Sequence, residues 1–189
     1  MSKVALSSNA LGTGTFTIAS PNSNTDRTLT LPDNTGTILT TATAGVPVNG
    51  PAFSAYPSGN QNITTTTFTK VALQLESFDT AGAFDNSTNY RFTPLIAGYY
   101  QVNWVATFLT TAAPAGTFSA LFKNGGNIQW TQSSGNSNAY PSMAASRLVY
   151  LNGSTDYLEL YVYQTSGTTL AVVGSSDYTN FSAFLARSA

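Results

Sequence analysis

The chain has 189 residues, of which only 8% are charged, and its formal net charge is -1, whereas ordinary soluble domains carry roughly 25% charged residues. A surface without clusters of Lys and Arg argues against binding to nucleic acids or to anionic membranes, since both depend on neutralising phosphate groups. The sequence contains no cysteine and no histidine, which excludes a disulfide scaffold and removes the commonest general base and metal ligand.

Residues 1–45 contain few large apolar side chains and many Thr, Ser, Asn and Gly. The first ten residues lack the continuous apolar core of a secretory signal. Brief β-like pieces at 15–18, 28–31 and 37–39 alternate with turn clusters at 20–24 and 32–36. One interpretation is a flexible tail. The other is a virion-attachment or shaft segment in which three chains lie side by side, with these side chains at the shared axis: Phe16, Ile18, Leu29, Leu31, Ile38 and Leu39.

The run at residues 12–41, GTGTFTIASPNSNTDRTLTLPDNTGTILTT, is similar to linker modules of bacteriophage tail-fibre and other virion-fibre proteins. Its most specific part is TLTLPDNTGTIL at 28–39. This resemblance favours the shaft, or a segment that orders when it binds the virion. Residues 41–50 are small and turn-rich, so we expect the domain boundary here, with 46–50 as the linker.

From residue 51 to the C-terminus, short strand patterns and turn signals follow one another at intervals typical of a jelly roll. Asn124-Gly125 favours a tight hairpin turn, whereas 79–89 and 133–141 have the composition of loops. No segment has a helical period, so residues 51–189 are predicted to form an all-β sandwich. The predicted strands cover 51–56, 62–76, 98–108, 117–123, 127–132, 142–151, 156–164, 168–173 and 178–187.

The strand pattern at 98–108 has the clearest alternation in the chain. Apolar side chains occupy one face, and Tyr99, Gln101, Asn103 and Thr107 occupy the other, as expected for a half-buried strand. Trp104 is therefore predicted to lie in the core. The predicted buried face consists of Tyr100, Val102, Trp104, Ala106 and Phe108.

Several segments resemble the globular head of complement q, a member of the tumour-necrosis-factor-like jelly rolls. Phe92, Gly98 and Tyr100 match the spacing of its signature, with Val102 and Trp104 where the family has Phe and Tyr. Five further runs follow the family's order: FTKV at 68–71, FDNST at 84–88, LFKNG at 121–125, DYLELYV at 156–162 and TNFSAFL at 179–185. The resemblance covers about residues 51–189 and implies a compact homotrimer around a threefold axis.

Both faces of the predicted strand at 157–164 are largely apolar, with Leu158, Leu160 and Val162 on one face. An outer strand of a monomeric sandwich should have a polar face. One interpretation is that tyrosines simply cover an exposed sheet; the other is that a second subunit covers them, since Tyr suits interfaces. We expect the second, with a trimer interface that contains Tyr157, Tyr161, Tyr163 and Phe181.

No catalytic motif, phosphate-binding loop or metal-ligand cluster occurs in the sequence. Asp79 and Asp85 flank one loop, where such residues usually form turns. We therefore expect neither an enzyme nor a cofactor nor a bound metal. Aromatic residues among amides suit adaptable contacts with carbohydrate or protein, which makes four residues near the loop at 133–141 candidates for ligand binding: Trp130, Asn136, Asn138 and Tyr140.

These patterns predict a non-enzymatic bacteriophage structural protein: a trimeric fibre or knob, made in the host cytoplasm, that attaches the virion to a host surface glycan or protein. In the first alternative the chain is a capsid decoration protein, held at threefold positions of the head shell by residues 1–45. In the second it is a free carbohydrate-binding module. In the two virion interpretations the N-terminal segment contacts other virion proteins, either in the tail or in the capsid.

Overall fold

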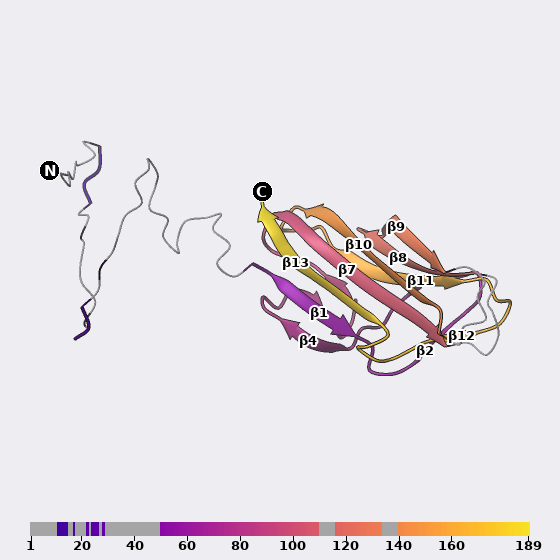
Figure 1. The fold of residues 1–189 in the computed structure, drawn as a ribbon. Coiled ribbons are helices and arrows are strands. Elements are labelled where there is room, and N and C mark those ends of the chain that lie inside the picture. The colour runs from indigo at the N-terminus through magenta and orange to yellow at the C-terminus, as the bar shows by residue number, and fades with distance from the viewer. Residues whose placement is uncertain are drawn as a thin grey trace. The chain divides into compact units, whose positions relative to one another are not determined.

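The computed structural model describes residues 50–109, 116–133 and 140–189, together with isolated positions between residues 11 and 28. The chain divides into two units, Met1–Ile38 and Leu39–Ala189. Every strand of the described residues lies in the second unit (Figure 1). The predicted linker at 46–50 falls almost wholly outside the described residues, so the domain boundary stays a prediction.

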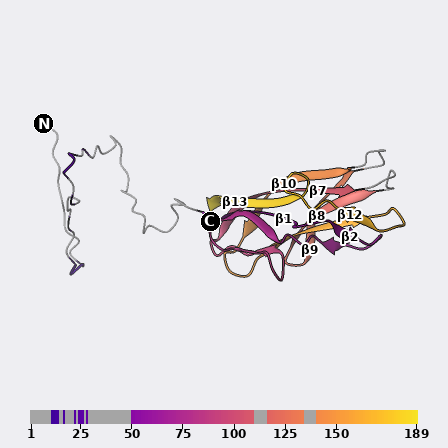
Figure 2. The same ribbon diagram turned by 90° about the horizontal axis from the view of Figure 1, so that it is seen from below.

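The described strands form two antiparallel sheets, seen from below in Figure 2. The first sheet contains, in spatial order, β4 (Leu75–Asp79), β1 (Ala52–Tyr56), β13 (Asn180–Ser188), β7 (Gly98–Leu109) and β10 (Ser142–Leu151), with β12 (Leu170–Val172) beside the end of β7 and β2 (Gln61–Ile63) beside β12. The second sheet contains β5 (Phe84–Asp85), β6 (Arg91–Phe92), β11 (Leu158–Gln164), β8 (Thr117–Lys123) and β9 (Gly126–Ser133), with β3 (Thr69–Lys70) also paired to β11. The predicted all-β sandwich is confirmed.

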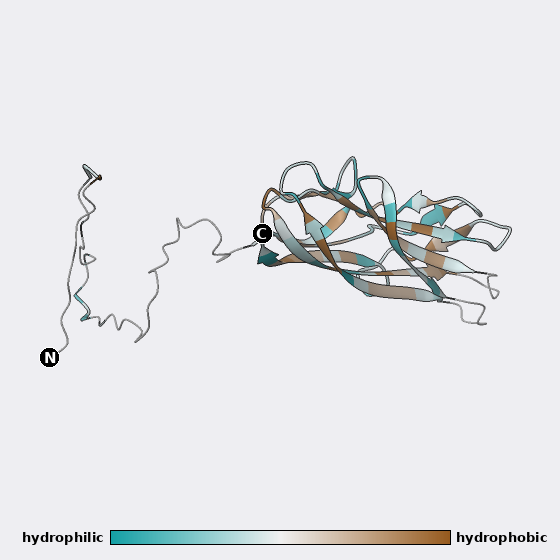
Figure 3. Ribbon diagram, turned by 90° about the horizontal axis from the view of Figure 1, so that it is seen from above, coloured by the Kyte–Doolittle hydropathy of each residue, from teal (hydrophilic) through white to brown (hydrophobic). Residues whose placement is uncertain are grey.

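The core lies between the sheets, and β7 supplies its centre. Every residue of the predicted buried face of this strand is at most 2% exposed. Hydrophobic and hydrophilic residues alternate along the strands (Figure 3), so each sheet has an inner and an outer face. The polar atoms that enter the core have partners: Trp104 Nε1 donates a 3.0 Å hydrogen bond to Ser119 Oγ, and Tyr100 Oη donates one of 2.7 Å to the Ile96 carbonyl. Burial raises the pKa of Tyr100 to about 12.

The predicted hairpin at Asn124-Gly125 is confirmed. Both residues have positive φ, 53° and 78°, as a two-residue turn between antiparallel strands requires. Most other predicted strands occur within two residues of their expected ends. None of the described residues belongs to a helix long and apolar enough to cross a membrane.

The long strand predicted at 62–76 is wrong. The chain forms β2, turns through residues 64–68, and then forms β3 and β4 in different sheets. Thr66 has a φ of 55°, and its N–H donates to the Gln164 carbonyl at 2.8 Å. This positive φ interrupts the extended backbone, and the turn places Phe68 on the outer face of the second sheet.

Candidate functional site

The tyrosines of β11 lie half-buried on the outer face of the second sheet. Tyr161 stands opposite Ala120 of β8, and Tyr163 stands opposite Phe118. Tyr161 stacks on Phe122 with ring centroids 4.1 Å apart and an interplanar angle of 28°. Tyr163 meets Phe118 edge-on at 5.7 Å. The second apolar face of β11 therefore continues across β8.

Phe68 completes this surface from the turn before β3. Its ring lies 5.0 Å from Tyr163, 5.6 Å from Phe122 and 6.1 Å from Trp130. Ala120 lies among these rings and is fully buried although it faces outward. We call this surface the aromatic patch, made of Phe68, Phe118, Phe122, Trp130, Tyr161 and Tyr163.

The aromatic patch changes the interpretation of the predicted trimer interface. Rings of the same chain already cover much of Tyr161 and Tyr163, so their apolar face has a partner without a second subunit. Tyr157 stacks instead with Arg91, whose guanidinium carbon lies 4.5 Å from the ring centroid. These three tyrosines remain reachable from solvent, but their pattern alone no longer requires a trimer.

Phe181 does not belong to any surface. It is fully buried between the sheets, where its ring meets Phe53 edge-on at 5.1 Å and Phe84 at 6.4 Å. Inclusion of Phe181 in the trimer interface is therefore wrong. Its strand pairs with both β1 and β7, and the alternation along β13 directs Phe181 inward and Phe184 outward.

A buried ion pair lies beside the aromatic patch. Glu159 of β11, only 5% exposed in its side chain, accepts from Lys70 Nζ of β3 at 2.5 Å. Lys70 Nζ also donates to the Asn89 carbonyl at 3.0 Å. Burial, followed by the charge of Glu159, raises the pKa of Tyr161, and the charge of Lys70 opposes this shift. The two charges are matched to each other, so the patch presents no uncompensated charge.

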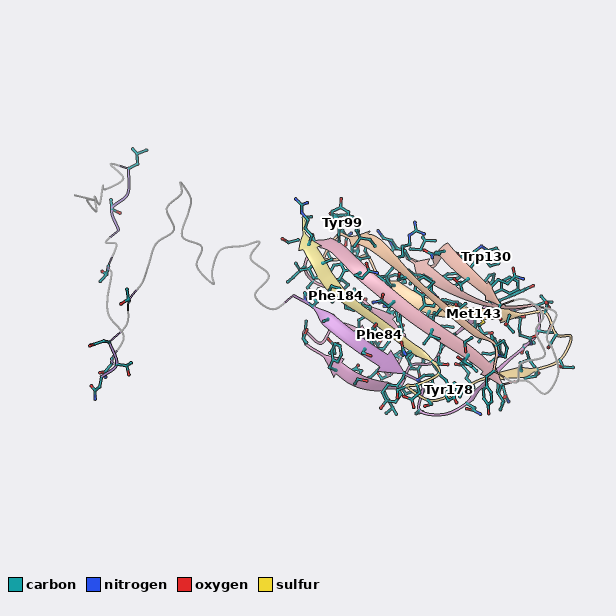
Figure 4. All side chains as sticks on the ribbon, in the orientation of Figure 1. Phe84, Tyr99, Trp130, Met143, Tyr178 and Phe184 are labelled. Carbon is teal, nitrogen blue, oxygen red and sulfur yellow. The ribbon has the colours of Figure 1, made fainter. Side chains whose placement is uncertain are left out.

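The four candidate ligand-binding residues do not form one site. Asn136 and Asn138 lie outside the described residues. Trp130 lies on β9 in the aromatic patch, 5.5 Å from Phe118. Tyr140 instead stacks on Tyr178 at 5.5 Å, next to the start of β10 in the other sheet. Figure 4 shows Trp130 and Tyr178 well apart.

The predicted virion-attachment residues cannot be placed. All six lie outside the described residues: Phe16, Ile18, Leu29, Leu31, Ile38 and Leu39. Their role stays a prediction from the sequence.

The carboxylates of the segment at 79–89 stabilise turns. Asp79 accepts from the N–H groups of Ala81 and Phe84, and Asp85 accepts from the three N–H groups at 87–89. These backbone hydrogen bonds lower the pKa of Asp85. An open hollow of ≈ 500 Å³ beside them is lined in part by Arg91, which is stacked on Tyr157. Among the described residues, no group of three or more His, Cys, Asp or Glu side chains could hold a metal ion.

A second surface lies on the outer side of the first sheet, and the sequence pattern predicts only those of its residues that belong to β7. Here Phe184 stands opposite Gln101, which stands opposite Leu148, and Tyr99 packs against Tyr150 with centroids 5.5 Å apart. We call this surface the open face. It contains Ala52, Ser54, Tyr99, Gln101, Asn103, Val105, Ala144, Ser146, Leu148, Tyr150, Asn180, Ser182, Phe184 and, opposite Tyr99, Arg187.

Apart from Arg187, the side chains of the open face carry no charge. In a chain with 8% charged residues, scarcity of charge is weak evidence for an interface. The large apolar side chains of the open face are stronger evidence. Tyr99, Leu148, Tyr150 and Phe184 are each between 43 and 55% exposed. Figure 4 shows Tyr99 and Phe184 towards the end where the chain terminates. Apolar rings and aliphatic groups among uncharged polar residues are typical of the centre of a protein interface.

No family model matches the sequence, and no curated protein matches it. Solved structures do match. Eiger TNF from S. frugiperda has a TM-score of 0.58 at 9% identity, covering 74% of this chain and 94% of that one. The globular domain of zebrafish complement 1qA has a TM-score of 0.54 at 14% identity, covering 74% and 99%.

The vertex protein P5 of phage PRD1 matches as well. Its TM-score is 0.54 at 18% identity, covering 71% of this chain and 96% of that one. At such identities the likeness establishes the fold alone. The predicted resemblance is confirmed at that level: the sandwich is a jelly roll of the kind found in tumour necrosis factor and complement q.

Proposed function

We propose that this chain is a non-enzymatic structural protein of a bacteriophage virion, with the jelly roll as a knob on the particle surface. The observation that carries the proposal is the fold shared with a phage vertex protein. The fibre-like sequence at 12–41 supports it independently. Within the knob, the carboxylates at 79–89 are engaged in turns, which supports a role in binding rather than catalysis.

The knob works as a homotrimer in this proposal, as the resemblance to complement-q heads implies. The open face supplies the contact between subunits, in place of the β11 tyrosines. Gln101 supports this assignment, because its Nε2 has only long contacts of 3.4 Å, to the Val102 carbonyl and to Asn103 Oδ1. A subunit laid on the open face would bury Leu148 and Phe184 and give this amide a stronger partner.

The N-terminal segment attaches the knob to the particle. The apolar residues Phe16, Ile18, Leu29, Leu31, Ile38 and Leu39 contact other virion proteins or pack with two sister chains. The knob then faces outward and binds the host surface. This arrangement joins a shaft sequence and a globular head in one short chain.

Capsid decoration is the second candidate, and one observation favours it. The phage protein of the same fold is named as a vertex protein. A vertex is a position on the capsid. In this version the N-terminal segment holds the trimer at threefold positions of the head shell. The knob and its open face are the same in both versions.

Labelling of intact particles tests the proposal. An antibody against the purified chain, coupled to gold and viewed by electron microscopy, should mark the tail if the chain is a fibre and the head if it decorates the capsid. Particles that carry no label, although the antibody recognises the purified chain, would refute a virion role.

A further inference from the structure

The aromatic patch holds Trp130 in place while leaving it open to solvent. Trp130 is 58% exposed, yet its ring is supported by Phe118 at 5.5 Å and by Phe68 at 6.1 Å. The small side chain opposite it in β8, Ala120, lets these rings close around the indole. A supported ring loses little conformational freedom when a ligand binds, which favours affinity.

The exposed area of the patch is too small for a standard protein interface. Trp130 and Phe68 are its most exposed rings, at 58% and 40%. With roughly 150–250 Å² for each aromatic side chain, these two rings offer about 200 Å², and the four half-buried rings add at most about 300 Å². A stable protein contact buries about 800 Å² on each partner. The area suits a small ligand that rests on one or two rings.

The charges near the patch point to a neutral ligand. Lys70 and Glu159 neutralise each other at 2.5 Å, and Arg91 is stacked on Tyr157. Arg147 also reaches β9, where its guanidinium donates to the Ile128 carbonyl. Among the described residues, each of these charged groups is already held by another group, so a charged ligand at Trp130 would have to displace an existing contact. A neutral ligand loses nothing by this, because it needs only ring faces and hydrogen-bonding groups.

Hydrogen-bonding groups lie at two places along the patch. Gln132 stands opposite Phe118, and Asn127 stands opposite Phe122, so both amides share the outer face with the rings. Both are exposed. Each amide offers two N–H donors and a carbonyl acceptor, which matches the hydroxyl groups of a sugar.

We propose that the aromatic patch binds an uncharged saccharide. The weakly positive C–H groups of a sugar ring lie on the negative face of the Trp130 indole, and the ring hydroxyls exchange hydrogen bonds with Gln132. The proposal names a ligand class for the host-binding role given above. The proposal rests on the host-binding role only for its statement that the sugar comes from the host surface. Binding itself is measured on the purified chain.

Calorimetric titration of the full chain tests the proposal. The probes are uncharged tetrasaccharides of glucose, galactose, mannose and N-acetylglucosamine, at up to about 10 mM, a range that detects weak binding. At least one should bind, and a sialylated oligosaccharide should bind more weakly. The same sugar should shift the tryptophan emission to shorter wavelength, because Trp104 is 2% exposed and only Trp130 can respond.

Variants distinguish this site from others. Trp130→Ala should abolish binding, and Gln132→Ala should weaken it about tenfold, the loss of roughly one hydrogen bond. The matched control is Leu95→Ala, which removes an apolar side chain that is 77% exposed and lies outside the patch. It should leave binding unchanged.

Three results would overturn the proposal: no binding by any of the four sugars, full binding by both the Trp130 and Gln132 variants, or dissociation of an oligomer by Trp130→Ala. The last result would make the patch a subunit contact. Failure of particle labelling would remove the virion role and leave the saccharide site standing.

Discussion

Removal of the cation from the buried ion pair should destabilise the jelly roll strongly. Glu159 is 5% exposed and Lys70 is 29% exposed in their side chains. Lys70→Met keeps the length of the side chain but leaves the Glu159 carboxylate without its cation. Loss of one member of a buried pair costs about 3–5 kcal/mol. Because Lys70 is partly open to water, we expect the lower end, about 3 kcal/mol.

Removal of the anion from the same ion pair should lower the stability of the jelly roll less than removal of the cation. Glu159→Gln removes the buried charge, while Lys70 keeps its 3.0 Å hydrogen bond to the Asn89 carbonyl and its contact with water. Its cost should be about 1 kcal/mol, the net value of a hydrogen bond. The double variant should be more stable than Lys70→Met alone, since a neutral amide replaces the stranded carboxylate.

Urea unfolding followed by circular dichroism measures all four proteins, at one chain concentration because association shifts apparent stability. Lys70→Met should lower the free energy of unfolding by about 3 kcal/mol, and in thermal unfolding of the same proteins it should lower the Tm by about 10 °C. If Lys70→Met and Glu159→Gln lose equal stability, or if neither loses any, the pair is not buried as described.

Three further changes test other contacts. In Gly98→Ala the added methyl group would collide with the Arg187 carbonyl oxygen at the end of β13; a loss of about 3 kcal/mol is expected, and an unchanged Tm would contradict this close approach. Hydrogen bonds, first from Lys123, lower the pKa of Asp156. Its stabilisation is therefore present above the unfolded value of 3.8 and is lost as the pH falls towards the lowered pKa, so Asp156→Asn should be less stable than the original chain at neutral pH but not in acid. Phe184→Asp places a charge on the open face and should convert the oligomer to monomers in sedimentation velocity; an unchanged mass would move the subunit contact elsewhere.

The core of the fold follows closely from the sequence. Period two along 98–108 identified the residues of β7 that share the buried face, and the paired positive φ values of Asn124 and Gly125 are what that dipeptide favours. Such local patterns determine strands and turns directly. Because the strand patterns follow one another along the chain, they also predict the order of the strands. The resemblance to complement-q heads depends on this order.

The surfaces were less predictable. Alternation shows which residues share a face of a strand but not which face turns inward, so the pattern at 178–187 fits Phe181 in an interface as well as in the core. The apolar outer face of β11 suggests a second subunit as its cover, because the sequence does not show that Phe68 of the same chain lies on it. The turn at Thr66, which positions Phe68, lies within a run of threonines that resembles a strand. The local pattern at 98–108 identifies only the β7 residues of the open face, because the rest of this surface depends on pairing between distant strands.

The mass of the full chain in dilute solution is the most direct test of an oligomeric virion knob. Light scattering coupled to size-exclusion chromatography should give about 60 kDa, which corresponds to three chains of 19.9 kDa. A folded species with the mass of one chain would contradict it.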